Sequence, residues 1–452
     1  MAQNLNMTRG NPLKQLFFFS LPLMFGNVFQ QLYTVVDTAI VGRGVGIDAL
    51  AALGTVDWLN WLFLGVAQGF TSGFAVRISQ NFGRGDFRGM QKAAGQSAFL
   101  SAVIALACVV LGQALLPVFL TLLRTPLDLR PMGSLYMRIM LSGFPAVMFF
   151  NYCSSLLRAV GNSKTPLFAM IAASVVNIVL DCVAVFILRW GIAGAAGATV
   201  IAQCFSGAIC AVKVLKTPEL HFKKSDWKPE GRLVKDLLGI GSPVAAKNVI
   251  IALGGMVVQS IVNGFTLSFI AGFTATNKLY GLLEIAATSY GYAVTTFVGQ
   301  NFGAMDLTRV KKGMRSATLL AIVTALLIAA VMLLFGREIT MIFISREDPL
   351  LAAEAGNIAY WYLCAMSVSL PILYLLYVYQ SGLQGMGNTV VPMISGILEF
   401  CLRVSLSAVV AFTGFQYGIF GAEVSAWWGA AIFLMIGYFR HYKKAQKRYP
   451  LS

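Results

Sequence analysis

Long apolar segments follow one another along the whole chain of 452 residues. Each is close to the roughly 20 residues that an α-helix needs to cross the hydrocarbon core of a bilayer. Since no water reaches that core, a spanning segment must pair its own backbone N–H and C=O groups, as a helix does. The sequence therefore predicts an all-α polytopic membrane protein. The runs are too long and too continuous for the alternating strands of a β-barrel.

Composition supports this prediction, because 58% of the residues are hydrophobic and only 12% are charged. A soluble protein of this length would need more polar residues to cover its surface. We expect about twelve spans, with bounds uncertain by a few residues. They are 15–41, 52–76, 93–116, 132–157, 165–188, 191–213, 238–262, 268–296, 314–335, 357–383, 391–413 and 417–439.

The net charge of +16 could suggest a nucleic-acid partner, but its distribution indicates a membrane topology instead. Basic residues gather in alternate connecting segments, mainly 77–92, 213–235, 309–315 and 440–448. An excess of Lys and Arg in the cytoplasmic segments is the rule for helical membrane proteins. We therefore expect a multi-pass protein of the bacterial cytoplasmic (inner) membrane with both termini in the cytoplasm. No nucleic-acid partner is needed to explain the charge.

An internal repeat divides the chain into two halves. Gln-Asn-Phe-Gly followed by Asp occurs at 80–86 and again at 300–306, and Gly-Asn followed by Pro occurs at 161–166 and at 387–392. With six spans in each half, both halves insert in the same orientation, as parallel repeats. The predicted parts are an N-terminal six-helix lobe (1–215), a cytoplasmic linker (216–236), a C-terminal six-helix lobe (237–440) and a basic cytoplasmic tail (441–452). The repeated Asp86 and Asp306 are expected to cap helices.

The first and fifth predicted spans carry polar residues that are costly in a bilayer. Asp37 lies in the otherwise apolar stretch QQLYTVVDTAIVG, and Asn177 and Asp181 lie four residues apart in SVVNIVLDCVAVF. A carboxylate at mid-membrane costs about 2.5–3.5 kcal/mol on insertion scales and usually faces the interior of the bundle. The spacing of four places Asn177 and Asp181 on one face of their helix.

Together these motifs resemble those of the multidrug and toxic compound extrusion (MATE) family over nearly the full length of the chain. The resemblance implies two pseudo-twofold-related six-helix bundles and a cation-coupled antiporter that expels organic, often cationic, compounds. It is strongest to the DinF-like and MepA-like bacterial branch. In that branch the coupling cation is handled by residues that correspond here to Asp37, Asn177, Asp181 and Thr199. The NorM-like branch uses carboxylates of spans seven and ten, which are absent from these spans here.

The candidate set of Asp37, Asn177, Asp181 and Thr199 offers only oxygen ligands for a cation, which suits a hard ion such as Na⁺. Two neighbouring carboxylates can equally hold a proton between them. The sequence does not choose between H⁺ and Na⁺ as the coupling ion. No other metal and no cofactor is expected.

The second half carries different charges in its predicted spans. Glu399 and Arg403 are four residues apart and could form an ion pair, while Lys278 and Glu284 lie on different faces of the eighth span. These four residues are candidates for substrate contact or gating. Glu423, near the start of the last span, is expected near the outer interface.

Two other classes of function, a flippase or specific exporter and an enzyme, are alternatives to an exporter of small organic compounds. A flippase for a lipid-linked saccharide, or an exporter of one specific metabolite, could use the same duplicated bundle. A flippase would be expected to line its cleft with several basic residues, and only Lys247, Lys278 and Arg403 qualify. An enzyme is not expected, because no cluster of catalytic residues and no ATP-binding GxxxxGK[ST] motif occurs. We expect a monomer in the lipid bilayer.

Overall fold

A computed structural model describes residues 5–123, 125–344 and 349–448. This part of the chain contains thirteen α-helices and no strand. The helices are α1 (Pro12–Gly44), α2 (Ile47–Arg84), α3 (Phe87–Leu122), α4 (Arg130–Ser142), α5 (Phe144–Ala159), α6 (Lys164–Cys182), α7 (Gly191–Leu215), α8 (Gly231–Val262), α9 (Leu267–Gly303), α10 (Leu307–Met341), α11 (Pro349–Gly385), α12 (Val390–Thr413) and α13 (Ile419–Arg448).

The helices confirm the predicted all-α polytopic fold. Helices α4 and α5 meet at a bend of 45°, so that the pair forms one element and twelve elements follow one another. Each predicted span lies within one of them to within about two residues, provided that α6 is taken together with the π-helical turn Val183–Ile187 that continues it. Among the described residues, nine helices are long and apolar enough to cross a membrane, or ten if the bent pair counts as one span. Helices α1 and α9 are not among these nine; α1 carries Asn27, Gln30 and Asp37.

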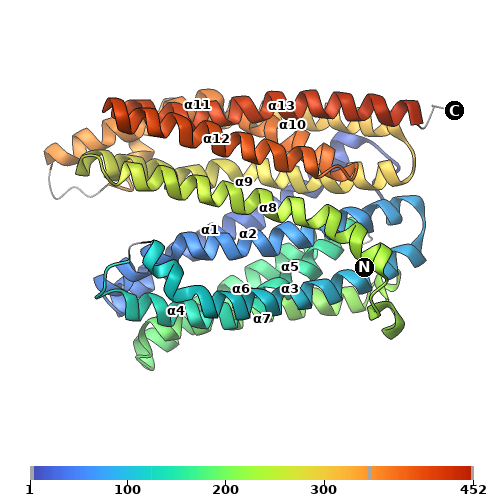
Figure 1. Cartoon of the computed structure of the whole chain (residues 1–452), viewed down its shortest axis with the longest axis horizontal. Helices are drawn as coiled ribbons and strands as arrows, with labels where there is room; N and C mark the ends of the chain where they lie inside the picture. The colour runs from blue at the N-terminus through green and yellow to red at the C-terminus, as the bar shows by residue number, and fades with distance from the viewer. Residues whose placement is uncertain (1–4, 124, 345–348, 449–452) are drawn as a thin grey trace. The chain divides into compact units, whose positions relative to one another are not determined.

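Two compact units make up the chain. The first consists of Met1–Met7 and Leu21–Asn248, and the second of Thr8–Ser20 and Val249–Ser452. Within the first unit the helices α2–α7 run alongside one another, and within the second the helices α9–α13 do so (Figure 1). Helices α1 and α8 each contribute residues to both units, so the units are not divided where the sequence repeat is.

Each unit has an apolar core of its own. In the first unit Leu59, Leu116 and Met148 are buried between α2, α3 and α5. In the second unit aromatic rings stack between α9, α11 and α13. The ring centroid of Tyr362 lies 5.0 Å from that of Phe273 and 4.7 Å from that of Phe420. Such contacts add to the free energy gained by burying the rings.

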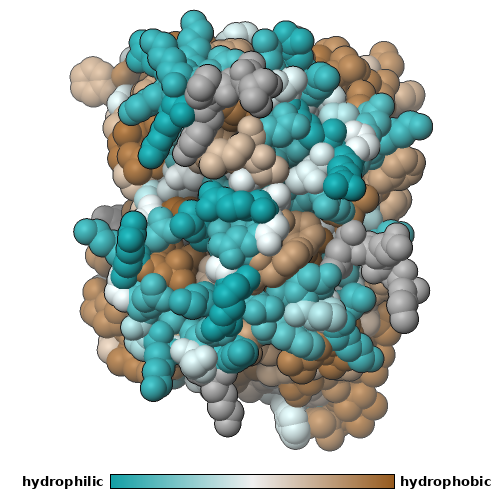
Figure 2. Space-filling model, turned by 90° about the vertical axis from the view of Figure 1, so that its right-hand side faces the viewer, coloured by the Kyte–Doolittle hydropathy of each residue, from teal (hydrophilic) through white to brown (hydrophobic). Residues whose placement is uncertain are grey.

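The C-terminal part of α13 carries the basic tail. Lys443, Lys444, Lys447 and Arg448 extend this helix beyond its apolar part. The end of α13 lies on the face that Figure 2 views, where hydrophilic side chains cover much of the surface. This agrees with the clustering of basic residues in the sequence.

The two repeated aspartates cap equivalent helices, as predicted. A side-chain oxygen of Asp86 accepts the backbone N–H of Gly89 at the start of α3 at 2.8 Å. Asp306 accepts the backbone N–H of Arg309 at the start of α10, also at 2.8 Å. In each helix the cap satisfies one of the N–H groups that have no partner within the helix.

Removal of either cap should lower stability modestly. We expect Asp86→Ala and Asp306→Ala each to lower the free energy of unfolding by about 1 kcal/mol, the usual effect of losing such a cap. Thermal unfolding of the purified protein in detergent measures the change, and Asp128→Ala, an exposed aspartate that caps no helix, is the control. Equal stability of all three variants and the unmodified protein would contradict the capping role.

Candidate functional site

Four polar residues predicted from the sequence lie together inside the first unit. Asp37 comes from α1, Asn177 and Asp181 from one face of α6, and Thr199 from α7. The carboxyl groups of Asp37 and Asp181 are close enough to interact directly, and Asn177 interacts with Asp181. The side-chain amide of Asn177 lies 3.5 Å from the hydroxyl of Thr199, which also donates to the carbonyl of Ala195 at 3.1 Å. The structure therefore brings all four residues into one chain of contacts.

Two of the four residues are fully buried, whereas Asp37 and Thr199 are partly exposed. Asp181 is 0% and Asn177 1% exposed. Both carboxylate oxygens of Asp181, Oδ1 of Asp37 and Oδ1 of Asn177 are buried, and none of these atoms makes a hydrogen bond of ordinary geometry with the described residues, although the side chain of Asn177 lies close to the carboxylate of Asp181. Buried acceptor atoms without a donor are costly. A positive charge would stabilise this arrangement. It could be a proton between the two carboxyl groups or a metal cation that binds their oxygens.

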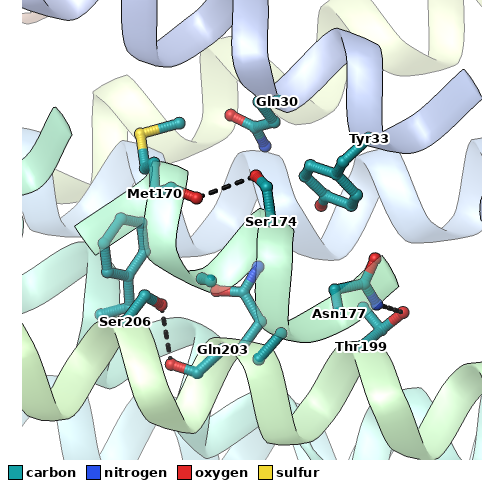
Figure 3. A pocket seen from close by; sticks show the side chains of 11 residues that line it. Gln30, Tyr33, Met170, Ser174, Asn177, Thr199, Gln203 and Ser206 are labelled. Atoms are coloured by element: carbon teal, nitrogen blue, oxygen red, sulfur yellow. Dashed lines mark hydrogen bonds between the residues drawn. The ribbon is translucent and has the colours of Figure 1, made fainter. Parts of the chain in front are cut away.

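A cavity opens beside Asn177 and Thr199, whereas Asp37 and Asp181 are not among its lining residues (Figure 3). Its volume is ≈ 40 Å³, enough for about three water molecules. The side chains of Asn177 and Thr199 lie at one end of the labelled group and Met170 and Ser206 lie toward the other. The space fits a small ion with a partial water shell. Its lining residues are Gln30, Tyr33, Phe150, Met170, Ala173, Ser174, Asn177, Thr199, Ala202, Gln203 and Ser206.

Several polar residues of this cavity were missed in the sequence. Gln30 and Tyr33 precede Asp37 by seven and four residues, so all three lie on one face of α1. That spacing could have identified them. Gln203 follows Thr199 by four residues on α7 and could have been found in the same way. Tyr136 of α4 does not line the cavity but interacts electrostatically with Asp37; it has no such signal, because its place depends on how α4 packs.

The α-helix that carries Asp181 changes its winding directly after this residue. Val183–Ile187 form a π-helical turn, in which the N–H of Leu188 donates to the carbonyl of Val183 at 2.9 Å. Such turns are rare and often occur at functional sites. This turn packs closely against Gly44 at the end of α1. A Cβ atom at Gly44 would lie 2.3 Å from a methyl carbon of Val185.

The charged candidates of the second unit do not belong to this cavity. Arg403 forms an ion pair with Glu423 of α13, with 2.8 Å between nitrogen and oxygen, and it also interacts electrostatically with Glu399, the partner that the spacing suggested. The side chain of Glu423 is only 15% exposed. Glu284 accepts a hydrogen bond from Tyr377, and Lys278 is exposed.

The fold defines a helical polytopic membrane protein. The sequence profile of the MatE family matches residues 22–183 and 243–409, one segment in each half of the chain. The chain belongs to this family, whose members are transporters rather than enzymes. The protein is accordingly a multi-pass membrane protein.

Individual relatives agree with this assignment. The chain is 28% identical over 352 residues to "Probable multidrug resistance protein YpnP" of Bacillus subtilis, covering 77% of this chain and 78% of the relative. It is 25% identical over 418 residues to "Probable multidrug resistance protein NorM" of Thermotoga maritima, covering 91% and 88%. One relative is not named as a multidrug protein: the "FAD transporter" of Shewanella oneidensis. It is 22% identical over 407 residues, covering 87% of this chain and 86% of the relative.

A solved structure shows the same fold over the whole chain. It is described as the outward-facing conformation of a multidrug resistance MATE family transporter. The TM-score is 0.91 at 21% sequence identity, and the match covers 99% of both chains.

Proposed function

We propose that this protein is an antiporter that exports small organic compounds by alternating access and is driven by a cation gradient. The observation that carries the proposal is the set of buried oxygens of Asp37, Asn177 and Asp181, which make no hydrogen bond of ordinary geometry with the described residues. A site of this kind gains most when it binds a positive charge. A cation that enters from one side and leaves on the other can therefore supply the energy for export.

In this mechanism the coupling ion, H⁺ or Na⁺, binds between Asp37 and Asp181. A contact between two carboxyl groups becomes a hydrogen bond only when one of them holds a proton. Na⁺ would instead be bound by both carboxylates, the amide oxygen of Asn177 and the hydroxyl of Thr199, with water in the neighbouring cavity. Either ion removes the repulsion between the two negative charges and so favours a closer packing of α1 against α6.

The cargo is proposed to be a cationic or neutral organic molecule, as the names of the multidrug relatives suggest. The relative named as a FAD transporter favours a second candidate, export of one anionic metabolite. We favour a cationic or neutral cargo because of the charges in the second unit. Arg403 is neutralised by Glu423, and Glu284 adds a negative charge. The termini are proposed to lie in the cytoplasm and the protein to act as a monomer in the inner membrane.

Transport under imposed gradients tests the proposal. The purified protein is inserted into lipid vesicles, and the movement of ethidium, a fluorescent organic cation, is followed under a pH gradient, a Na⁺ gradient or neither. We expect accumulation against its concentration gradient with one of the two gradients and none in their absence. Movement that is equally fast without any gradient would refute ion coupling, and movement of FAD but not of ethidium would favour the second candidate.

A further inference from the structure

One face of α3 is occupied by the segment that leads from α7 to α8. Arg88 donates two hydrogen bonds to the carboxylate of Asp226, at 2.6 and 2.9 Å. One turn further, Lys92 forms an ion pair with Glu230 at 3.5 Å. Another turn on, the amide of Gln96 donates to the carbonyl of Asp226 at 2.7 Å and accepts the N–H of Glu230 at 3.1 Å. The predicted linker is thus fastened to the first unit at three successive turns.

Asp226 is the central residue of this contact. It is 5% exposed, and its carboxylate also accepts the backbone N–H of Lys223 at 2.8 Å. Although burial acts to raise the pKa of Asp226, the hydrogen bonds from Arg88 and Lys223 and the charge of Arg88 hold it below its usual value. The segment lies directly on α3, since a Cβ atom at Gly95 would come within 2.9 Å of Asp226.

The first part of α8 continues this attachment along α2. Arg77 forms an ion pair with Asp236 at 3.1 Å. The backbones approach closely at Gly69, where a Cβ atom would lie 2.4 Å from Cα of Ala245. The amide of Asn248 donates to a carbonyl of α2 at 2.9 Å. Asn248 is the last residue of α8 in the first unit, and the helix continues from Val249 as part of the second.

The second unit holds the beginning of α1 in a corresponding way. Arg309, three residues after the capping Asp306 of α10, donates to the carbonyl of Gly10 and to the side-chain oxygen of Gln15, both at 2.8 Å. Its guanidinium group also lies over the ring of Phe297, 5.4 Å from the ring centroid. Residues 8–20 belong to the second unit, and α1 continues from Leu21 as part of the first.

We propose that Arg88 and Arg309 are positioning residues for transport. Arg88 fastens the segment that leads into α8, and Arg309 fastens the first turn of α1, each within its own unit; both helices continue into the other unit. For α1 the consequence is direct, because its second half carries Asp37 while its first turns are held by Arg309. When the ion binds and α1 shifts, the movement is therefore passed to the second unit, provided that the first turns of α1 stay fastened there. The inference rests on the proposed ion-coupled export.

The test compares Arg88→Gln and Arg309→Gln with two matched controls. Arg84→Gln and Lys311→Gln remove the same charge from exposed residues near each arginine. In vesicles we expect the maximal rate of ethidium export to fall about tenfold in the two test variants. An effect of this size is usual when a residue that couples two sites is replaced. Binding of ethidium to the purified protein should keep its affinity, which a general loss of structure would not allow.

Two further measurements show that the attachment itself is responsible. Amide hydrogen exchange should become faster at residues 11–16 in Arg309→Gln and at residues 223–230 in Arg88→Gln, and in neither region of the controls. The exchanged pair Arg88→Asp with Asp226→Arg should recover export. Export at the control rate, a parallel loss of ethidium affinity, unchanged exchange or a failed recovery would each overturn the inference. Gradient-independent export by the unmodified protein would instead refute the proposed coupling, and the exchange results would still report on the attachment.

Discussion

Vesicles containing Asp37→Asn are expected to show no gradient-driven accumulation of ethidium, at the level of vesicles without protein. Asparagine keeps the size of the side chain but cannot ionise, so the repulsion between Asp37 and Asp181 is permanently absent. The site then neither needs nor releases a cation within the cycle. We expect Asp181→Asn to have the same effect, because each carboxyl group is the other's partner.

The control for this prediction is Asp48→Asn, which neutralises an exposed aspartate at the start of α2 in the same unit. It should export at the rate of the unmodified protein. Both site variants should remain folded, with an unfolding temperature at least equal to that of the unmodified protein, since the repulsion between two buried charges is removed. Full gradient-driven accumulation in Asp37→Asn would refute the coupling site.

Much of the candidate site could be predicted from the sequence, because its members are visible as neighbours on single helices. The spacing of four between Asn177 and Asp181 fixes their common face on any α-helix. The cost of an isolated Asp37 in an apolar span indicated that it faces the protein interior. The length of the apolar runs likewise predicted where the helices lie. The repeated Asp86 and Asp306 predicted two helix starts.

Contacts between helices could not be predicted, because they depend on how each helix is rotated and where it bends. The spacing of Glu399 and Arg403 suggested an ion pair within α12, but it gave no sign of the ion pair that Arg403 forms with Glu423 on α13. The π-helical turn after Asp181 has no signal in the spacing of apolar residues. The attachment of α1 and α8 to different units at their two ends was also invisible, since the repeat suggested two separate halves.

The ion pair between Arg403 and Glu423 leads to the second prediction. The two side chains are only 7% and 15% exposed. Removing one member of a buried pair leaves the other charge without compensation, which typically costs about 3–5 kcal/mol. We therefore expect Arg403→Met to lower the unfolding temperature of the purified protein strongly, although methionine fills a similar volume and is apolar.

The double variant Arg403→Met with Glu423→Gln separates the charge effect from packing. Removing both charges should restore most of the lost stability, because replacing a buried pair as a whole is often nearly neutral. Arg337→Met is the matched control, since Arg337 is exposed and hydrogen-bonded to Asn357, and it should change stability little. Unfolding of all variants in the same detergent gives the comparison. If the double variant unfolds at the same temperature as Arg403→Met, the loss comes from packing, and the buried pair does not stabilise the second unit in the way proposed.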